Sequence, residues 1–305
     1  MNKEFLDLAE QLKSSVSCTV RLNELMSGHT SFKIGGPADI LVLPESIEQL
    51  REVLKVVKET VVPLTLLGNG SNVFVRDKGI RGIVIKLGNM LRHFYEAEDL
   101  LVLGSGYSLA LASYKAMECG KTGMEFAVGI PGSIGGAVYM NAGAYDGEMQ
   151  NIVNCVKVMD LQGNERVLTA EELNFGYRKT SLQNSGLIVT EVTLKMPSGN
   201  KDEIKSKMDD FSHRRISKQP LEMPSAGSMF KRPPGYFAGT LIDQAGLKGY
   251  TVGGAQISTK HAGFVVNVGG ATAADVLQLI KDVQTKIKAG VGVELQPEVL
   301  VIGEE

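Results

Sequence analysis

The chain has 305 residues, of which 43% are apolar, and its formal net charge is −2 at pH 7. This length and composition are sufficient for two or three small domains with a sizeable hydrophobic core. The near-neutral charge argues against a nucleic-acid-binding protein, which would show a basic stripe. The three widely spaced cysteines, Cys18, Cys119 and Cys155, provide neither a disulfide framework nor a zinc site.

The N-terminal segment is predicted to form an amphipathic helix, with Phe5, Leu8, Ala9 and Leu12 on one face. Acidic residues run through this segment, so it lacks the apolar core of a signal peptide. No stretch of the sequence reaches the ~18 unbroken apolar residues that a membrane span needs. We therefore expect a cytoplasmic protein without a membrane partner.

Residues 39–67 are typical of a βαβ unit, in which strands over 39–43 and 61–67 flank a helix that begins after Ser46. The second strand leads into a turn of small residues, Gly68-Asn69-Gly70-Ser71-Asn72. A turn at the carboxyl end of a strand is where ligands bind in α/β sheets. This turn is the first candidate binding segment.

The pattern between Val73 and Met196 is richer in strands, and the clearest runs are 82–87, 100–106, 152–160 and 187–196. Ser108 is predicted to cap a helix that stops at Gly120. Thr169 and Glu172 have the spacing of a capping box, which predicts a short helix there.

The segment from Gly123 to Gly143 concentrates glycines at 129, 132, 135 and 136, with apolar residues between them. Because it is apolar and lacks basic residues, it is not a solvated linker. Two interpretations remain open at this point. The backbone N–H groups of a glycine-rich turn can hold a phosphate, or the glycines can form a tight buried crossover with close-packed backbone.

Two familiar phosphate motifs receive little support. The chain has no GxxxxGK[ST] sequence, which excludes a P-loop NTPase, and Gly104-Ser105-Gly106 lacks the third glycine of a Rossmann fingerprint. Two anion-holding turns about sixty residues apart suit a ligand with a central pyrophosphate, such as a dinucleotide cofactor. Neutral donors to such a ligand are available from Ser71, Asn72, Ser133 and Asn141.

The C-terminal third begins with a charged helix over 201–217, whose predicted buried side is Ile204, Met208 and Phe211. Prolines at 220 and 224 mark a boundary after it. The remainder is predicted to contain helices over 237–245 and 272–288 and short strands over 254–258 and 264–268.

Six segments in this order resemble the UDP-N-acetylenolpyruvoylglucosamine reductase family, bacterial flavoenzymes that make UDP-N-acetylmuramate for peptidoglycan. They are TSFKIGGPA (30–38), GNGSN (68–72), GIPGSIGGAVYMNAGA (129–144), FGYRKTS (175–181), AGSMFKRP (226–233) and ELQPEV (294–299). The resemblance covers nearly the whole chain after residue 20. Between Tyr177 and Thr190 there is no room for the extra loop of the family's longer group, so the chain resembles the shorter, type II group.

The resemblance implies an α+β fold, with a two-part FAD-binding domain of the vanillyl-alcohol oxidase/PCMH type and a smaller α+β substrate-binding domain. The expected division is an N-terminal helix (1–20), FAD-binding subdomains (21–75 and 76–200) and a substrate-binding domain (201–305) whose last strand returns to the active site. Carried over by motif, the residues that contact non-covalent FAD are Gly68, Asn69, Gly70, Ser71, Asn72, Gly129, Ile130, Pro131, Gly132, Ser133, Gly135, Gly136, Ala137, Asn141 and Gly143.

The family's catalytic positions correspond to Ser228, as proton donor, Arg178 and Glu298. A guanidinium would stabilise the charge that hydride transfer leaves on the enolpyruvyl carboxylate, and a protonated glutamate would donate a hydrogen bond to the same enolate. A serine becomes an adequate acid in a positive local field, here supplied by Lys231, Arg232 and Arg178. Taken singly, each of the three residues also has a non-catalytic interpretation. Ser228 can be a turn residue, Arg178 a surface arginine and Glu298 a solvated glutamate.

The candidates for binding the substrate's UDP diphosphate are Arg214, Lys218, Lys231 and His261, and Tyr177 is a candidate for lining the sugar pocket. Arg214 lies on a charged helix, so a solvated surface position is equally consistent with its sequence context. The scattered histidines form no metal-binding set, and we expect no metal.

The implied activity uses NADPH to reduce FAD. The nicotinamide then leaves, and the enolpyruvyl ether of a UDP-sugar takes a hydride at its terminal carbon and a proton from Ser228 at the neighbouring carbon. One rival is an FAD-linked oxidase of the same fold acting on an alcohol or sugar, and another is a non-catalytic nucleotide-binding module. We expect a monomer whose partner is the small-molecule substrate.

Overall fold

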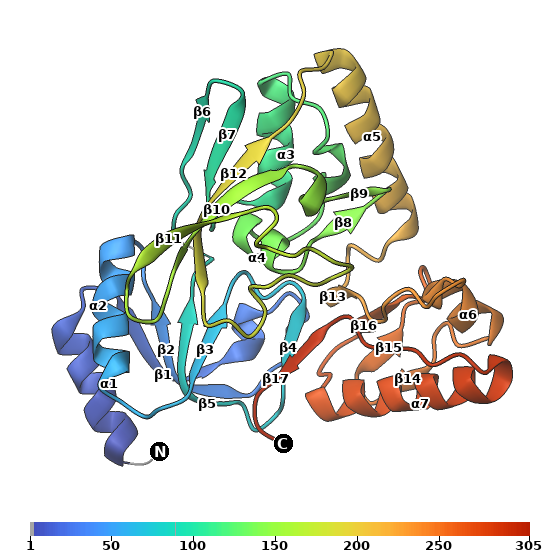
Figure 1. Cartoon of the computed structure of the whole chain (residues 1–305). Coiled ribbons are helices and arrows are strands. Elements are labelled where there is room, and N and C mark those ends of the chain that lie inside the picture. The colour runs from blue at the N-terminus through green and yellow to red at the C-terminus, as the bar shows by residue number, and fades with distance from the viewer. Residues whose placement is uncertain (1–2, 89) are drawn as a thin grey trace. The chain divides into compact units, whose positions relative to one another are not determined.

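The computed structural model describes residues 3–88 and 90–305, and its helices and strands are labelled in Figure 1. The chain divides into two compact units. The first comprises Met1–Leu22, Ile40–Asn69 and Gly82–Arg214, and the second comprises Asn23–Asp39, Gly70–Arg81 and Arg215–Glu305. The finer division predicted for the FAD-binding region stays a prediction.

The first unit contains most of a four-stranded sheet in the order β1-β2-β5-β3, formed by Thr19–Leu25, Pro37–Leu43, Ile80–Lys86 and Leu64–Leu67. Residues 23–25, 37–39 and 80–81 of these strands belong to the second unit. Helices α1 (Lys3–Ser15) and α2 (Ile47–Lys58) bury apolar residues such as Leu12 and Leu54 against the sheet. The predicted βαβ unit is present as β2, α2 and β3. Its strands are not neighbours, because β5 lies between them and pairs in parallel with β3.

A five-stranded antiparallel sheet follows in the same unit, in the order β11-β10-β12-β7-β6. Its strands are Glu165–Thr169, Val153–Met159, Ile188–Lys195, Leu100–Gly104 and Phe94–Ala97. Helices α3 (Leu109–Glu118) and α4 (Ile134–Tyr139) share its hydrophobic core. Met159 and Ile188, at the other end of the sheet, belong to the α1–α2 core, so the two sheets of this unit are packed continuously.

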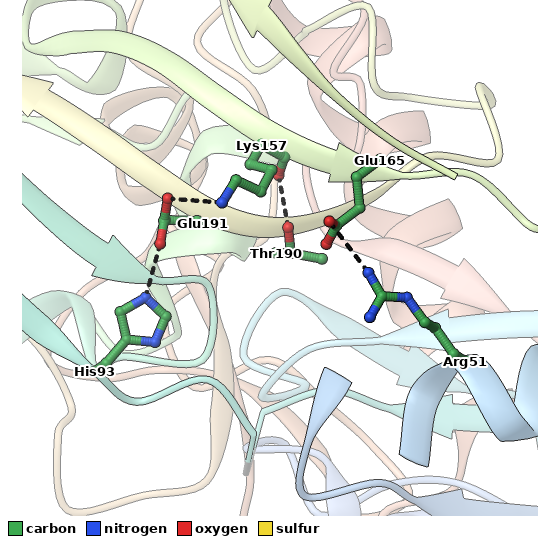
Figure 2. A network of polar contacts seen from close by, with 6 residues as sticks. All are labelled: Arg51, His93, Lys157, Glu165, Thr190 and Glu191. Atoms are coloured by element: carbon green, nitrogen blue, oxygen red, sulfur yellow. Dashed lines mark hydrogen bonds and ion pairs between the residues drawn. The ribbon is translucent and has the colours of Figure 1, made fainter. Parts of the chain in front are cut away.

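Charged side chains connect α2 to the second sheet and link neighbouring segments within that sheet (Figure 2). Arg51 of α2 forms an ion pair with Glu165 of β11 at 3.1 Å. Glu191 of β12 lies 3.1 Å from His93 and 3.4 Å from Lys157. All of these charged groups are partly exposed to solvent, so the network ties neighbouring elements together at the surface.

The remaining part of the first unit contains short elements and most of a long helix. Strands β8 (Gly143–Ala144) and β9 (Gly147–Glu148) pair antiparallel, and single 3-10 turns η2 (Glu125–Ala127) and η3 (Met149–Asn151) lie on either side of them in the chain. Helix α5 (Lys201–Lys218) ends past the boundary of the unit. Its predicted buried side is confirmed, because Ile204, Met208 and Phe211 pack with Val128.

The short helix predicted at Thr169–Glu172 is wrong. The backbone N–H of Thr169 donates to the Glu172 carboxylate at 2.8 Å, and the N–H of Glu172 donates to the Thr169 hydroxyl at 3.3 Å. Both hydrogen bonds of a capping box are therefore formed, but the chain continues as a turn after β11. The capping pair closes the turn, and no helix propagates from it.

The second unit contains a four-stranded antiparallel sheet, β13-β16-β15-β14, formed by Ser225–Ser228, Phe264–Asn267, Ala255–Ile257 and Thr251–Val252. Helices α6 (Ala238–Gln244) and α7 (Ala273–Val291) pack on it around a core that includes Val265 and Leu279. Phe32 and Phe74 enter the same core, and their rings meet edge to face at 6.0 Å.

The chain ends in the second unit with β17 (Leu300–Ile302), which pairs in parallel with β4 (Val73–Val75). Segment η1 (Met26–His29) is a single 3-10 turn that precedes Phe32 in the sequence. The helix predicted from Thr272 is present as α7, and Thr272 caps it with a complete capping box. The Asp77 carboxylate accepts from the first two helical N–H groups at 2.8 and 2.9 Å. Within the described residues, no helix is long and apolar enough to cross a membrane, and no cluster of His, Cys, Asp and Glu forms a metal site.

Candidate active site

The glycine-rich stretch is a buried crossover at the start of α4. Ser133 caps this helix, because its hydroxyl accepts from the N–H of Gly136 at 3.4 Å. The N–H of Gly135 donates to the carbonyl of Ser105 at 2.8 Å, and a Cβ atom on Gly135 would lie 2.8 Å from the Cβ of Ser105. A side chain does not fit there, which explains the glycine at 135.

The crossover also keeps two main-chain donors available. The N–H groups of Ile130, Ile134 and Ala137 donate to carbonyls of the chain. Among the described residues, no acceptor is paired with the N–H groups of Gly132 and Ser133. The crossover interpretation is therefore confirmed at Gly135. The phosphate-binding interpretation stays a prediction, and Gly132–Ser133 is where main-chain dipoles can meet an anion.

Within the first unit, the start of the first glycine turn lies beside the second turn, although about sixty residues separate them in the sequence. A Cβ atom on Gly68, which begins the first turn, would lie 3.5 Å from the Ser133 hydroxyl. Asn69 packs closely on Gly88, where a Cβ atom would meet the Asn69 side-chain oxygen at 2.0 Å. The backbone is thus close-packed on both sides of the position where a pyrophosphate is expected.

The second half of the first turn belongs to the second unit. Gly70 has a φ of +68°, and a Cβ atom there would lie 2.2 Å from the carbonyl oxygen of His29. The N–H of Ser31 donates to the carbonyl of Gly70 at 3.0 Å, and the Ser31 hydroxyl donates to the carbonyl of Ser225 at 2.8 Å. Ser31 therefore joins the turn to strand β13.

Ser228 ends strand β13 at a β-bulge. Ser225 pairs with Val266 and Ser228 with Phe264, so three steps along β13 oppose two along β16. Gly227, inside the bulge, has a φ of +84°. A bulge changes the direction in which the next side chain points, and Ser228 is exposed to solvent while Met229 is buried.

Glu298 lies on the segment next to Ser228. Its N–H donates to the carbonyl of Met229 at 2.9 Å, and the N–H of Lys231 donates to the carbonyl of Gln296 at 2.8 Å. The Asn72 amide donates to the carbonyl of Glu298 at 3.4 Å. The second unit thus brings two of the three predicted catalytic residues onto adjacent segments, beside the end of the first glycine turn.

Arg178 is in the first unit, at the corner of a tight turn. The N–H and carbonyl groups of Gly176 and Lys179 are paired at 2.9 and 3.1 Å, and Arg178 between them has a φ of +55°. Its guanidinium donates to the carbonyls of Asn141 at 3.4 Å and Gly143 at 3.1 Å. The predicted arginine therefore faces the end of the glycine-rich stretch.

Asn141 does not provide the neutral side-chain donor to a cofactor that the sequence suggests. It is 0% exposed, and its Nδ2 donates to the carbonyl of Gly176 at 3.0 Å and to Glu148 at 3.1 Å. Its Oδ1 accepts from the N–H of Gln150 at 3.0 Å. Both the donor and the acceptor group of this amide are therefore hydrogen-bonded within the protein.

The predicted substrate-binding residues have varied surroundings. Arg214 pairs with Asp210 at 2.7 Å on the exposed side of α5, and Tyr177 is half exposed beneath the Arg178 guanidinium. Lys218 ends α5, and Lys231 is half buried. Burial lowers the pKa of His261, and its Nδ1 accepts from the N–H of Gly263 at 3.0 Å. Neutral His261 therefore offers an Nε2–H donor rather than a cation.

Two positioning groups were missed by the sequence reasoning. Ser31 lies within TSFKIGGPA, so the family resemblance pointed to its segment but not to its bond to Ser225. Gln183 donates to the carbonyls of Tyr139 and Arg178, both at 3.1 Å. No periodicity or motif signals this glutamine, since its partners are set by the tertiary fold.

Comparison with known proteins identifies the class. Residues 38–169 match the family model described as FAD binding domain, and residues 219–302 match that of the UDP-N-acetylenolpyruvoylglucosamine reductase C-terminal domain. The chain is 49% identical over 286 residues to UDP-N-acetylenolpyruvoylglucosamine reductase of Clostridioides difficile (strain 630), covering 94% of each chain. It is 50% identical over 302 residues to that of Clostridium perfringens (strain SM101), covering 99% of this chain and 98% of the relative.

Its fold is also similar to the crystal structure of UDP-N-acetylenolpyruvylglucosamine reductase from Thermus caldophilus. The TM-score is 0.78 at 38% identity, and the match covers 93% of this chain and 98% of the other. The chain is thus an FAD-binding flavoprotein, and the predicted α+β class with an FAD-binding domain is confirmed. The vanillyl-alcohol oxidase type of that domain stays a prediction. The chain belongs to the UDP-N-acetylenolpyruvoylglucosamine reductase family.

Proposed function

We propose that this chain reduces UDP-N-acetylglucosamine enolpyruvate to UDP-N-acetylmuramate, a step in the synthesis of peptidoglycan precursors. The observation that carries the proposal is the identity of about half of all residues to reductases that are matched over nearly their whole length. FAD is the cofactor and NADPH is the reductant. The alternative of an FAD-linked oxidase is less supported, because these near-full-length relatives are named as reductases.

The glycine turns fit the FAD diphosphate. Gly132 and Ser133 offer main-chain N–H groups without a partner among the described residues, and Gly68 brings the first turn against Ser133 without a side chain between them. We assign Gly68–Asn72 and Gly129–Ala137, together with the backbone near Gly143, to non-covalent FAD binding. Donors of this kind need no cationic side chain, which agrees with the absence of Lys and Arg from the second turn.

The three catalytic roles are carried over from the family resemblance, and the chemistry of the reduction gives each residue type a reason. The hydride that adds to the terminal carbon of the enolpyruvyl group would come from bound FAD, which NADPH reduces. Arg178 holds the substrate carboxylate and stabilises the negative charge that develops on it. Ser228 delivers a proton to the neighbouring carbon, and Glu298, on the adjacent segment, donates a hydrogen bond to the same enolate.

The substrate's diphosphate requires cations or N–H donors. We assign this role to Lys218, Lys231 and the Nε2–H of His261. Arg214 is the weakest member of the set, because its exposed ion pair with Asp210 also accounts for its position.

We further propose a monomer acting in the cytoplasm, where NADPH and UDP-sugars are available, and light scattering on the purified protein tests the oligomeric state.

The visible absorption spectrum tests the function directly. We expect the purified protein to show an oxidised flavin spectrum that anaerobic NADPH bleaches and that UDP-N-acetylglucosamine enolpyruvate restores. UDP-N-acetylglucosamine, which lacks the enolpyruvyl group, is the matched control and should leave the flavin reduced. A reduced flavin that is reoxidised by oxygen but not by the enolpyruvyl compound would contradict the proposal and favour an oxidase.

A further inference from the structure

A buried amide connects three loops around the arginine turn. Asn141 follows α4 and is 0% exposed, and its side chain contacts Gly176, Glu148 and the backbone of Gln150 at 3.0–3.1 Å. A carboxamide has two donor hydrogens and an acceptor oxygen. Since acceptors surround Nδ2 and a backbone donor meets Oδ1, the hydrogen-bond network fixes the orientation of the amide.

The same residue contacts Arg178 from two directions. Its Nδ2 holds the carbonyl of Gly176, the residue that opens the tight turn, and its own backbone carbonyl accepts from the Arg178 guanidinium at 3.4 Å. Arg178 has a φ of +55°, a conformation that is uncommon for a bulky residue and persists where surrounding contacts impose it. The Asn141 side chain is one such contact.

We propose that Asn141 is a positioning residue that sets the place and direction of the Arg178 guanidinium for the substrate carboxylate. This inference rests on the proposed function, since it assumes that Arg178 acts on that carboxylate. Asn141 acts through Arg178 and touches neither cofactor nor substrate with its side chain. A displacement of about 1 Å in a positioning group can cost about 10²-fold in rate.

The local chemistry explains why asparagine suits this position. Its backbone has a φ of +43°, which asparagine tolerates better than most residues. Aspartate has the same shape, but it would place a carboxylate oxygen near the Glu148 carboxylate and the Gly176 carbonyl, where Nδ2 now donates. Alanine would leave both acceptors without the donor that Asn141 provides.

The test compares the two half-reactions of Asn141→Ala by stopped-flow absorbance at the flavin band. We expect flavin content and reduction by NADPH to stay within about twofold of wild type. Reoxidation by the enolpyruvyl substrate should slow about 10²-fold. Thr190→Val is the matched control, because it removes a buried side-chain bond to the carbonyl of Lys157, at 3.1 Å, in the same unit (Figure 2). Its reoxidation rate should equal that of wild type.

A double variant separates positioning from general damage. Arg178→Lys alone should strongly slow reoxidation, because the ammonium group of lysine cannot form the paired, coplanar hydrogen bonds that a guanidinium forms with a carboxylate. If Asn141 acts through Arg178, adding Asn141→Ala to Arg178→Lys should slow reoxidation little further. Multiplicative effects, or equal losses in both half-reactions, would overturn the proposal.

Glu148→Gln provides a second test if Asn141→Ala fails to fold. This substitution keeps an oxygen acceptor for Asn141 but removes its charge, which weakens the hydrogen bond. We expect reoxidation to slow by about fivefold, with NADPH reduction unchanged. Unchanged reoxidation would overturn the positioning role. If wild-type flavin is not reoxidised by the enolpyruvyl compound, it is the proposed function that fails.

Discussion

The predicted catalytic residues are held in two different ways. The turn of Arg178 is tied down by side chains, since Asn141 and Gln183 both donate to its backbone carbonyls. Ser228 and Glu298 lie on segments joined by backbone hydrogen bonds of 2.8–2.9 Å, beside a glycine bulge. The turn of Arg178 is therefore sensitive to loss of a polar side chain, and the segments of Ser228 and Glu298 are sensitive to a change in backbone conformation.

The largest effect is expected where a reacting group itself is removed. Ser228→Ala should leave NADPH reduction of the flavin intact and slow its reoxidation by the enolpyruvyl substrate by about 10²–10⁴-fold, the usual range for general acid catalysis. Rapid mixing with each reactant separately measures both steps. Ser225→Ala, on the same strand, is the control. A Ser228→Ala enzyme with normal turnover would remove the proton-donor role.

The next prediction tests the backbone that carries Ser228. A Cβ atom on Gly227 would meet nothing within 4 Å, but its φ of +84° disfavours alanine. Gly227→Ala should therefore cost about 1–2 kcal/mol of stability and also slow reoxidation, because the bulge directs Ser228. Gly235→Ala is closely matched, with a φ of +76° and the same open surroundings, but lies outside the strand.

Urea unfolding and flavin reoxidation of these two variants give the comparison. Both should lose similar stability, and Gly227→Ala alone should slow reoxidation. Equal reoxidation rates would show that the bulge does not orient Ser228.

Much of the fold follows from local sequence signals. Ser46, Ser108 and Thr272 begin helices as predicted, because N-cap hydrogen bonds form with residues only three positions away. The same local signal misled at Thr169, where the capping bonds form but close a turn. Helix propagation depends on packing that a four-residue pattern does not contain.

The candidate site was less accessible to sequence reasoning. The glycine pattern alone could not separate a phosphate turn from a crossover, because the choice depends on partners such as Ser105, distant in sequence. Ser228, Arg178 and Glu298 came from the family resemblance, since each is an ordinary residue type in an ordinary context. The polar contacts of Asn141 depend on residues 148, 150 and 176, which only the folded chain brings together.

Two adjacent glycines test how tightly the crossover is packed. Gly135→Ala places a Cβ 2.8 Å from the Cβ of Ser105, whereas Gly136→Ala places one 3.4 Å from the flexible Ser133 hydroxyl. We expect Gly135→Ala to cost about 1–3 kcal/mol through overpacking. Gly136→Ala should be near neutral, since alanine's better helix propensity, worth about 1 kcal/mol, offsets the contact. Urea unfolding of both flavin-free proteins measures the difference, and equal losses would contradict the packing argument.

The burial of His261 predicts that the stability of the protein depends on pH. Burial lowers its pKa below the ordinary 6.5, so the folded protein binds fewer protons at this site than the unfolded chain. Stability should therefore fall as the pH drops through and below about 6.5. Urea midpoints at pH 8 and pH 5 should differ less for His261→Gln than for wild type. An unchanged difference would mean that other groups cause the loss.

The smallest effect is expected for the exposed ion pair of Arg51 and Glu165, whose side chains are 38% and 35% accessible. A double-mutant cycle with alanine at both positions should give a coupling of about 0.2–1 kcal/mol, because solvent screens the charges. The coupling should shrink further in 1 M salt, where the screening length is about 3 Å. Asn141 differs from this pair, because its side chain is 0% exposed and its hydrogen bond to Gly176 holds the turn of Arg178. A salt-independent coupling well above 1 kcal/mol would show that the ion pair is not a surface contact of the usual kind.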